Sequence, residues 1–366
     1  MIATRTQPKN ILDQPDQAAK IDRLQMAGLL NRFSEQIQDG IRIGKAFVLP
    51  RSLAGNFDKI VFVGMGGSAI GGDVLRSLGA KELALPLFVV RHYDLPGFVD
   101  SKTLCIFSSY SGNTEETISA FRQGIKKGAK ALSISSGGEL AHLSRKASVP
   151  WIEIPKGLPP RAALGYSVFP LLQAFSQLKL LRWDARAVEE TVELLLSLSK
   201  KCGLENLTVK NPAKKLAQAL WNKWVVIYAG TELLDSAALR FRNQIEENAK
   251  AIASHHLLAE MNHNEILGWE YPKSLVKKSV CVFFQDAEDH PRIQLRMEFT
   301  KKLLANERKI PVEEIHTQGK SRLARLFSAI HLGDWVSYYL ALLYRVDPTP
   351  VKVIEALKKE LAQVPQ

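Results

Sequence analysis

The strongest constraint on the fold is a buried strand that leads directly into a glycine- and serine-rich turn and then into a helix. Residues 103–107 form a strongly apolar run, and an amphipathic segment with Ile118, Phe121 and Ile125 follows the turn. The first half of the chain repeats this order, and further strands are predicted at 59–63, 87–90, 129–135 and 151–154. Strands that alternate with helices form a parallel sheet, wound right-handed and covered by helices on both faces.

A second alternating unit occupies the other half of the chain. The pattern predicts strands at 224–228 and 280–284, an extended piece at 251–257, and helices at 184–199, 233–250, 291–306, 326–345 and 351–361. The expected fold class is therefore α/β with two lobes, each a parallel sheet flanked by helices on both faces. We place the first lobe at 21–185 and the second at 186–366.

The N-terminal segment does not belong to either alternating pattern. Residues 1–20 are polar and contain two prolines, so they are expected to form a flexible arm. Apolar residues recur at helical spacing over 21–43, which predicts one amphipathic helix leading the first lobe. That helix is expected to end near Gly40 or Gly44, because glycine is common where helices stop.

Composition and charge exclude several classes of protein. Apolar residues make up 46% of the chain and charged residues 23%, as in ordinary globular proteins. The net charge is +12, but the basic residues are spread out and no nucleic-acid-binding motif is present, so a solvated surface and local attraction of a phosphorylated substrate are the favoured interpretations. No signal peptide or membrane span is evident, and the three cysteines are widely separated. These features predict a cytoplasmic protein with no metal site and no membrane or nucleic-acid partner.

The turn after 103–107 carries the first candidate site. Ser109, Ser111 and Thr114 offer hydroxyl groups, and Gly112 lets the backbone come close to a ligand. The following helix presents free N–H groups and the positive end of its dipole. An ordinary N-cap would need one hydroxyl, whereas this turn has several, so the pattern favours an anion site, most often for phosphate.

A glycine-rich turn at 64–72 opens the preceding helix. It lacks the third glycine of a dinucleotide-binding motif, because Ala69 stands there. That motif also has an acidic residue at the end of the next strand, whereas Arg91 and His92 come first there. A nicotinamide-dependent enzyme is therefore a second-rank alternative, and the missing Walker lysine argues against a nucleotide triphosphatase. Ser68 lies in this turn, at the edge of the sheet where ligands of such folds bind, and can face the same anion as Ser109.

Several motifs in a fixed order make a resemblance specific. They are Gly64-Met65-Gly66-Gly67-Ser68, Ser109-Tyr110-Ser111-Gly112-Asn113-Thr114-Glu115-Glu116-Thr117, Pro160-Arg161-Ala162-Ala163-Leu164, Met261-Asn262-His263-Asn264-Glu265-Ile266 with Gly268-Trp269, and Asp347-Pro348-Thr349-Pro350-Val351. The first two resemble a sugar isomerase (SIS) domain. The others narrow the resemblance to the bifunctional phosphoglucose/phosphomannose isomerases of archaea and bacteria, and it runs from about residue 21 to the end.

This resemblance implies an enzyme of carbohydrate metabolism that interconverts glucose 6-phosphate, and also mannose 6-phosphate, with fructose 6-phosphate. No cofactor or metal is implied. The sugar phosphate would be bound by Gly67, Ser68, Ser109, Ser111 and Thr114. Arg161 would lie near the reacting carbons, Glu247 would be the general base, and His263 would assist ring opening from the partner subunit of a homodimer. Thr349, on which the mannose activity depends, and Lys358 match the tail segment that closes the site.

The residues alone leave alternatives open. Glu246 adjoins Glu247, and either is a suitable carboxylate base if its pKa is raised toward working pH. His263 could instead cap a loop, and His255 and His256 point to opposite faces of an extended segment, which disfavours a shared metal. A non-catalytic sugar-phosphate sensor and another SIS isomerase also remain as alternative functions.

Overall fold

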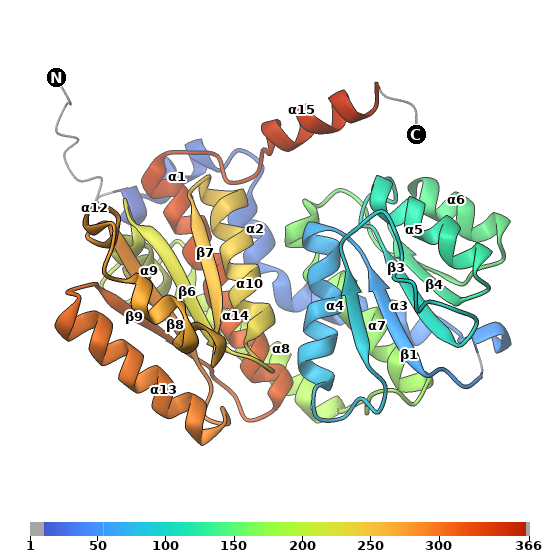
Figure 1. The fold of residues 1–366 in the computed structure, drawn as a ribbon. Helices are drawn as coiled ribbons and strands as arrows, with labels where there is room; N and C mark the ends of the chain where they lie inside the picture. Colours follow the sequence, from blue (N-terminus) through green and yellow to red (C-terminus); the bar gives the residue numbers. More distant parts are fainter. Residues whose placement is uncertain (1–10, 54, 364–366) are drawn as a thin grey trace.

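The computed structural model describes residues 11–53 and 55–363 and contains two parallel sheets that lie side by side (Figure 1). The first has the order β2-β1-β3-β4-β5, formed by Lys59–Val63 (β1), Leu87–Val90 (β2), Thr103–Ser108 (β3), Lys130–Ser135 (β4) and Trp151–Glu153 (β5). The second has the order β7-β6-β8-β9, formed by Trp224–Gly230 (β6), Ala253–Leu258 (β7), Ser279–Gln285 (β8) and Val312–His316 (β9). All pairs within both sheets are parallel, which confirms the predicted fold class.

Helices cover both sheets. Around the first sheet they are Gly66–Gly79 (α4), Glu115–Lys126 (α5), Gly138–Lys146 (α6) and Leu164–Gln177 (α7). Around the second they are Ala185–Cys202 (α8), Pro212–Leu220 (α9), Asp235–Gln244 (α10), Pro291–Lys302 (α13) and Arg322–Tyr344 (α14), with shorter turns at Glu265–Gly268 (α11) and Lys273–Val276 (α12). Because helices lie on both faces, β3 is buried at all six positions, and this is why it reads as an uninterrupted apolar run. The lobe boundary at 185/186 stays a prediction, and it falls at the start of α8.

Helix α14 forms the core of the second lobe. Within the described residues it is the one helix with the length and hydropathy to cross a membrane, and its most apolar stretch is completely buried inside the protein. It packs against α8, α9 and α10. Its apolar character therefore reflects burial within the fold.

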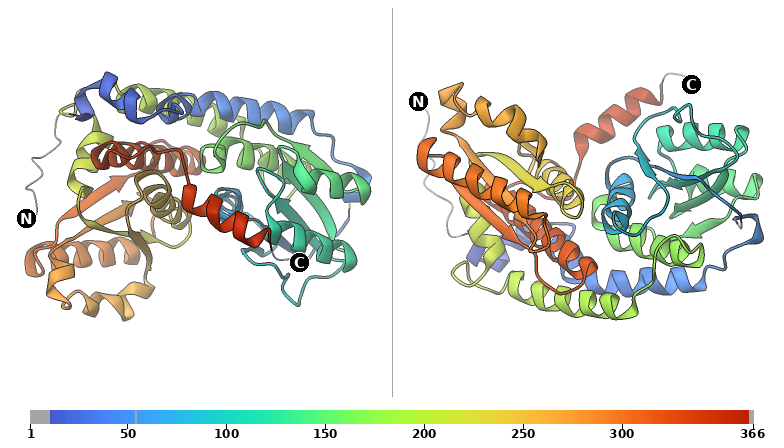
Figure 2. Two further views of the ribbon diagram at one scale, coloured as in Figure 1. Left: turned by 90° about the horizontal axis from the view of Figure 1, so that it is seen from above. Right: turned by 60° about the horizontal axis from the view of Figure 1, so that its bottom comes forward.

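The two lobes meet along α4 and α10. The Ser77 hydroxyl donates a hydrogen bond to Asp235 at 2.7 Å, and Arg76 forms an ion pair with the same carboxylate at 2.7 Å. The N-terminal helices also connect the lobes, as Figure 2 shows, because Met26–Asn31 (α2) contacts α14 and Phe33–Ala46 (α3) contacts α7. The position of the first sheet relative to α10 is thus fixed by direct contacts.

The prediction of one helix over 21–43 was wrong. The chain forms Pro15–Ile21 (α1), then α2 and α3, and Asp22 ends the first of these runs by accepting hydrogen bonds from the Met26 and Ala27 N–H groups at 2.7 and 2.9 Å. A side chain that binds the free N–H groups of the next helix starts a new helix there. The described part of the expected arm, from Ile11, is helical as well, and residues 1–10 lie outside the described residues.

Helix α3 ends at Ala46, two residues after Gly44, so the predicted helix end near Gly44 is confirmed, although neither Gly40 nor Gly44 is itself the end. Both lie inside α3 and are buried against α7. A Cβ atom at Gly40 would lie 2.8 Å from the Gly165 carbonyl oxygen, and one at Gly44 would lie 2.7 Å from Cβ of Gln173. The glycines allow the two helices to approach closely.

One strand was not predicted, and one predicted helix differs from the structure. Strand β9 was missed because its sequence, Val-Glu-Glu-Ile-His, is mostly polar, and Ile315 alone is buried at this sheet edge. The single helix expected over 233–250 is α10 followed by a π-helical turn, Ile245–Ala249. The terminal helix is Lys352–Leu361 (α15), which extends from the second lobe toward the first (Figure 1).

We predict that Gly44→Val lowers the free energy of unfolding by about 2–3 kcal/mol, because the added side chain overpacks the contact between α3 and α7. Gly28→Ala is the matched control, since the nearest atom to its new Cβ would be 3.9 Å away. That change should raise stability by up to about 1 kcal/mol through helix propensity. Urea unfolding measures both, and equal effects would contradict the close-packing explanation.

Candidate active site

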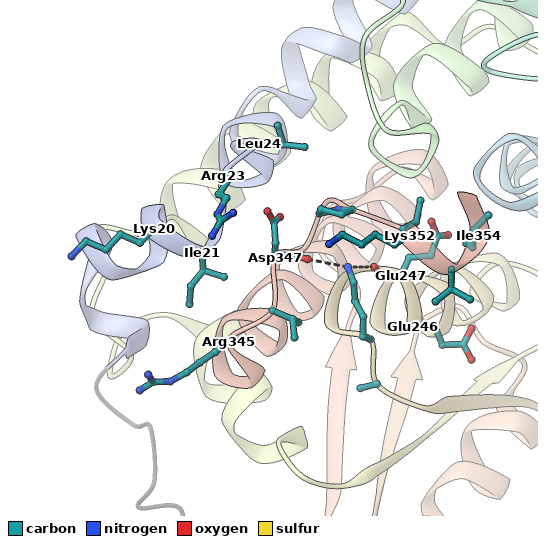
Figure 3. Close-up of a pocket in the computed structure, with 16 residues that line it drawn as sticks. Lys20, Ile21, Arg23, Leu24, Glu246, Glu247, Arg345, Asp347, Lys352 and Ile354 are labelled. Atoms are coloured by element: carbon teal, nitrogen blue, oxygen red, sulfur yellow. Dashed lines mark hydrogen bonds between the residues drawn. The ribbon is translucent and has the colours of Figure 1, made fainter. Parts of the chain in front are cut away.

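The candidate site lies where the turn after α10 meets the first lobe. Glu246 and Glu247 line two cavities at once. One, of about 460 Å³, is also lined by Gly66 and His255. The other, of about 1120 Å³, is also lined by Lys250 and by the segment that leads into α15 (Figure 3). The glutamate pair therefore borders space that opens toward both lobes.

The serine-rich turn after β3 brings its hydroxyls together as predicted for Ser109 and Thr114. Their side-chain oxygens are 2.8 Å apart, and Ser109 is fully buried. Ser111 is exposed, and its Oγ accepts a hydrogen bond from the Asn113 N–H at 3.2 Å. The turn leads directly into α5, whose first N–H groups lie at the same edge of the sheet. This arrangement can bind an anion.

Gly112 is required at this turn by both its conformation and its surroundings. Its φ angle is +73°, a region that favours glycine, and a Cβ atom would lie 1.8 Å from the Gly137 carbonyl oxygen. The Leu140 N–H donates a hydrogen bond to the Gly112 carbonyl at 2.8 Å. The serine-rich turn is thereby held against the start of α6.

The start of α4 lies between the serine-rich turn and the segment that contains Arg161. Ser68 is buried, and its Oγ accepts a hydrogen bond from the Tyr110 N–H at 2.9 Å. A Cβ atom at Gly67 would lie 2.9 Å from the Arg161 nitrogen, so glycine permits the main chain of that segment to touch α4. Gly67 and Ser68 therefore lie between the serine turn and Arg161.

Tyr110 is a supporting residue that the sequence analysis missed. Its hydroxyl donates to the Pro155 carbonyl and accepts from the Leu158 N–H, both at 2.9 Å. It thus ties the serine turn to the segment that precedes Arg161. This contact could not be predicted, because a tyrosine in a motif does not reveal a partner 45 residues away.

Arg161 is the most constrained side chain of the site. It lies in the short 3₁₀ helix Pro160–Ala162 and is 3% exposed. Its Nε donates to Asn248 Oδ1 at 2.6 Å, and Nη2 donates to the carbonyls of Pro348 and Thr349, each at 2.7 Å. Its Nη1 lies 3.4 Å from Glu247 Oε2. Four of its five N–H groups thus have protein acceptors, and one on Nη1 remains.

Burial lowers the pKa of Arg161 from its ordinary value, and the nearby Glu247 carboxylate opposes that shift. The guanidinium stays charged, because its ordinary pKa is far above neutrality. The remaining N–H on Nη1 is therefore a positively charged donor beside a carboxylate. That pair can stabilise a negative oxygen and move a proton at neighbouring atoms of one ligand.

The π-helical turn decides which glutamate faces Arg161. Glu247 makes the 3.4 Å contact, whereas Glu246 lies 3.6 Å from Arg242 Nε and is more exposed. Burial raises the pKa of Glu246, with Arg242 opposing and Glu247 adding to the shift. Asn248 anchors the turn, since its Nδ2 donates to Ser337 Oγ at 2.9 Å. Single π turns of this kind occur often at functional sites.

A buried charge cluster on α14 supports this arrangement and was also missed. Asp334 accepts hydrogen bonds from Arg240 at 3.0 and 2.7 Å and from Gln244 at 2.8 Å. Arg240 also donates to the Arg161 carbonyl at 2.8 Å, so it holds the main chain of the first lobe. An isolated aspartate in an otherwise apolar helix is the signal that could have indicated this cluster.

The two tail residues lie in different environments. The Thr349 carbonyl binds Arg161, and the Thr349 hydroxyl oxygen is buried with no hydrogen-bond partner within the part of the chain that the structure describes. Lys358 lies on α15, where every residue is exposed. The structure therefore brings Thr349 to Arg161 and leaves Lys358 on an exposed helix.

His263 does not join the cluster of its own chain. It is exposed at the end of the 3₁₀ helix Glu260–His263 and lines neither cavity that Glu247 borders. Its neighbours are anchored, because Asn262 donates to Thr300 and Glu265 accepts from Tyr228. The main chain therefore holds His263 in place while its ring faces outward.

The histidine pair on β7 has separate environments. His256 Nδ1 is 3.0 Å from Glu265, whereas His255 lines the smaller Glu247 cavity. Burial lowers the pKa of His255 to about 4, helped by the charge of Arg242, so its ring is neutral at neutral pH. Among residues 11–53 and 55–363, no group of three or more His, Cys, Asp or Glu side chains is arranged to hold a metal ion.

Comparisons with known proteins agree with this geometry. Residues 209–361 match a family model described as the bacterial phospho-glucose isomerase C-terminal SIS domain. A bifunctional phosphoglucose/phosphomannose isomerase from Caldicellulosiruptor bescii is 46% identical over 90% of this chain and 97% of that protein. The Aquifex aeolicus protein of the same name is 41% identical over 82% of this chain and 90% of that protein. A solved glucose-6-phosphate isomerase-like protein from Thermus thermophilus covers 92% of this chain and 97% of that one, with a TM-score of 0.61. At 18% identity it shows the fold alone.

We predict that Asp334→Asn lowers the free energy of unfolding by about 3 kcal/mol, because it leaves the buried Arg240 guanidinium without a compensating charge. Glu270→Gln is the control, since it removes an ion pair with Arg308 that is largely exposed to water. This change should cost less than about 1 kcal/mol. Denaturant unfolding of both variants tests the difference, and a comparable small loss in each would show that the buried pair gives no special support.

Proposed function

The chain belongs to the bifunctional phosphoglucose/phosphomannose isomerase family, and we propose that it converts both glucose 6-phosphate and mannose 6-phosphate into fructose 6-phosphate, and back. The observation that carries the proposal is the Arg161–Glu247 contact at 3.4 Å, beside an anion-binding turn. A carboxylate next to a charged N–H donor suits removal of a proton from a carbon next to a carbonyl group.

The phosphate end of the sugar would bind at the serine turn. Ser109 and Thr114 provide hydroxyls from the turn, Ser111 adds an exposed hydroxyl, and Ser68 with Gly67 contributes from the start of α4. The N-termini of α4 and α5 add partial positive charge. Gly67 touches the main chain of Arg161. A sugar whose phosphate is bound at this turn would therefore extend toward the Arg161 guanidinium.

The isomerisation would proceed through a cis-enediolate. Glu247 takes the proton from C2 of the open-chain aldose, and the electron pair of that C–H bond forms the C1–C2 double bond while O1 becomes negative. The hydroxyl proton of O2 passes to O1, Glu247 returns its proton to C1, and O2 becomes the carbonyl oxygen of the ketose. The free N–H of Arg161 stabilises the negative oxygen in the intermediate. Because the guanidinium supplies this charge, the proposed steps need no metal ion or cofactor.

Ring opening would use a second subunit. His263 is held with its ring facing outward and away from the cavities of its own chain, which supports a homodimer in which the partner's His263 reaches the substrate. A histidine suits this step because its unperturbed pKa lies near neutrality. The two-lobed enzyme would act in the cytoplasm on soluble sugar phosphates.

Dual specificity would depend on the tail. The Thr349 hydroxyl is buried and lacks a partner within the described residues, so it would reach a sugar hydroxyl near C2, where glucose and mannose differ, only if the tail moves. Lys358 would approach the site only if α15 moves, because it is exposed on that helix. Assaying fructose 6-phosphate formation from both aldose phosphates tests the proposed function directly, and activity on neither would reject it.

We predict that Glu247→Gln lowers kcat by about 10²–10⁴-fold, because the amide cannot accept the C2 proton. Exchange of the C2 hydrogen in deuterated water should be lost, whereas binding of fructose 6-phosphate stays within about threefold of the wild type. Glu246→Gln is the matched control and should keep kcat within about threefold. Exchange that persists in the Glu247 variant and disappears in the Glu246 variant would reverse the assignment.

We predict that combined Ser109→Ala and Ser111→Ala substitution raises KM by at least about tenfold, because charge-assisted hydrogen bonds to the phosphate are lost. The effect on kcat should be smaller, since neither hydroxyl contacts the reacting carbons. Ser101→Ala is the control, because that exposed serine precedes β3 at the opposite end of the strand. An unchanged KM in the double variant would exclude the serine turn as the phosphate site.

A further inference from the structure

Lys250 connects two segments of the site through main-chain oxygens. It follows the π-helical turn directly, and its Nζ donates to the Glu247 carbonyl at 2.8 Å and the Asn248 carbonyl at 3.3 Å. The same Nζ donates to the Asp347 and Pro348 carbonyls at 3.0 and 3.1 Å. The first pair belongs to the turn that carries the proposed base, and the second pair belongs to the tail.

The tail residues that Lys250 contacts belong to an irregular segment. They lie between the end of α14 at Tyr344 and the start of α15 at Lys352, outside any helix or strand. The Pro348 carbonyl also accepts from Arg161 Nη2 at 2.7 Å, so two cations bind one oxygen. Hydrogen bonds from charged donors are stronger than neutral ones, so both cations restrain the tail.

We propose that Lys250 is a positioning residue, whose ammonium group holds the tail at 347–349 against the turn that aims Glu247. The position of the tail and the orientation of Glu247 are then coupled through Lys250. Lys250 acts through these two segments, since its three N–H groups are shared among four acceptors and all four are main-chain carbonyls. The inference rests on the proposed role of Glu247 and extends it to a residue to which the sequence analysis assigned no role.

The charge needed for this role is present at neutral pH. Partial burial and the nearby Arg161 lower the pKa of Lys250 to about 8, whereas Asp347 and Glu247 favour its charged form. The residue has a positive φ angle of 53°, which costs free energy for a side chain other than glycine. The charged hydrogen bonds to the four carbonyls help to offset that cost.

Lys250→Met tests the proposal, because methionine keeps the length of the side chain but cannot donate a hydrogen bond. We expect kcat for fructose 6-phosphate to fall at least about tenfold with KM changed less than about threefold, since the serine turn is untouched. Hydrogen exchange of peptides spanning 345–352 should become at least about fivefold faster. Lys250→Arg should restore both values to within about threefold of the wild type.

Lys20→Met is the matched control, since this exposed lysine lines the same cavity without contacting the tail carbonyls. Both its kcat and its tail exchange should match the wild type. Unchanged tail exchange in Lys250→Met would overturn the proposal, and so would faster exchange with unchanged kcat. If Lys250→Met fails to fold, as judged by circular dichroism, the same measurements on Lys250→Gln decide.

The exchange measurement also separates this proposal from the proposed function. A wild-type protein without isomerase activity would reject the proposed function. The exchange comparison would still show whether Lys250 restrains the tail, because it requires no substrate. If tail exchange is faster in Lys250→Met and the wild type is inactive, Lys250 restrains the tail but has no role in isomerisation.

Discussion

The geometry of the site depends on burying one guanidinium group. Arg161 belongs to the first lobe, and a buried charge is tolerated only when its donors find acceptors and its charge is compensated. Those acceptors come from the turn after α10, at Glu247 and Asn248, and from the tail, at Pro348 and Thr349. A single side chain therefore fixes the first lobe, the second lobe and the tail relative to one another.

Satisfying Arg161 also limits what it can do. All three guanidinium nitrogen atoms donate hydrogen bonds to the protein. The one N–H group without an acceptor among the described residues lies on Nη1, the nitrogen closest to Glu247. The main chain of Arg161 is fixed from both sides, by Arg240 across the lobe interface and by Gly67 at the start of α4. In the proposed mechanism this rigidity keeps the donor and the base aimed at adjacent atoms of one sugar, which a loose pair of surface charges could not do.

The sequence predicted those parts of the molecule whose signal is local. Apolar runs located the buried strands, and the hydroxyl-rich turn was recognised because Ser109, Gly112 and Thr114 are neighbours in the chain. Strand β9 was missed because an edge strand buries few side chains, and Asp334 was missed because its partners lie on another helix. The base could not be assigned between two adjacent glutamates, because a π turn changes the periodicity on which such an assignment relies.

The two proposed chemical steps place different demands on the geometry of the site. Proton transfer at carbon needs fixed distances, and the residues proposed for it lie on elements tied by buried hydrogen bonds through Asn248 and Arg240. Ring opening moves a proton between oxygen and a nitrogen base, a step with less demanding geometry, and its proposed residue, His263, lies on an exposed short helix. A site closed on all sides would also prevent substrate entry. A restrained tail and a histidine from a second subunit would allow the site to be completed after the sugar phosphate has bound.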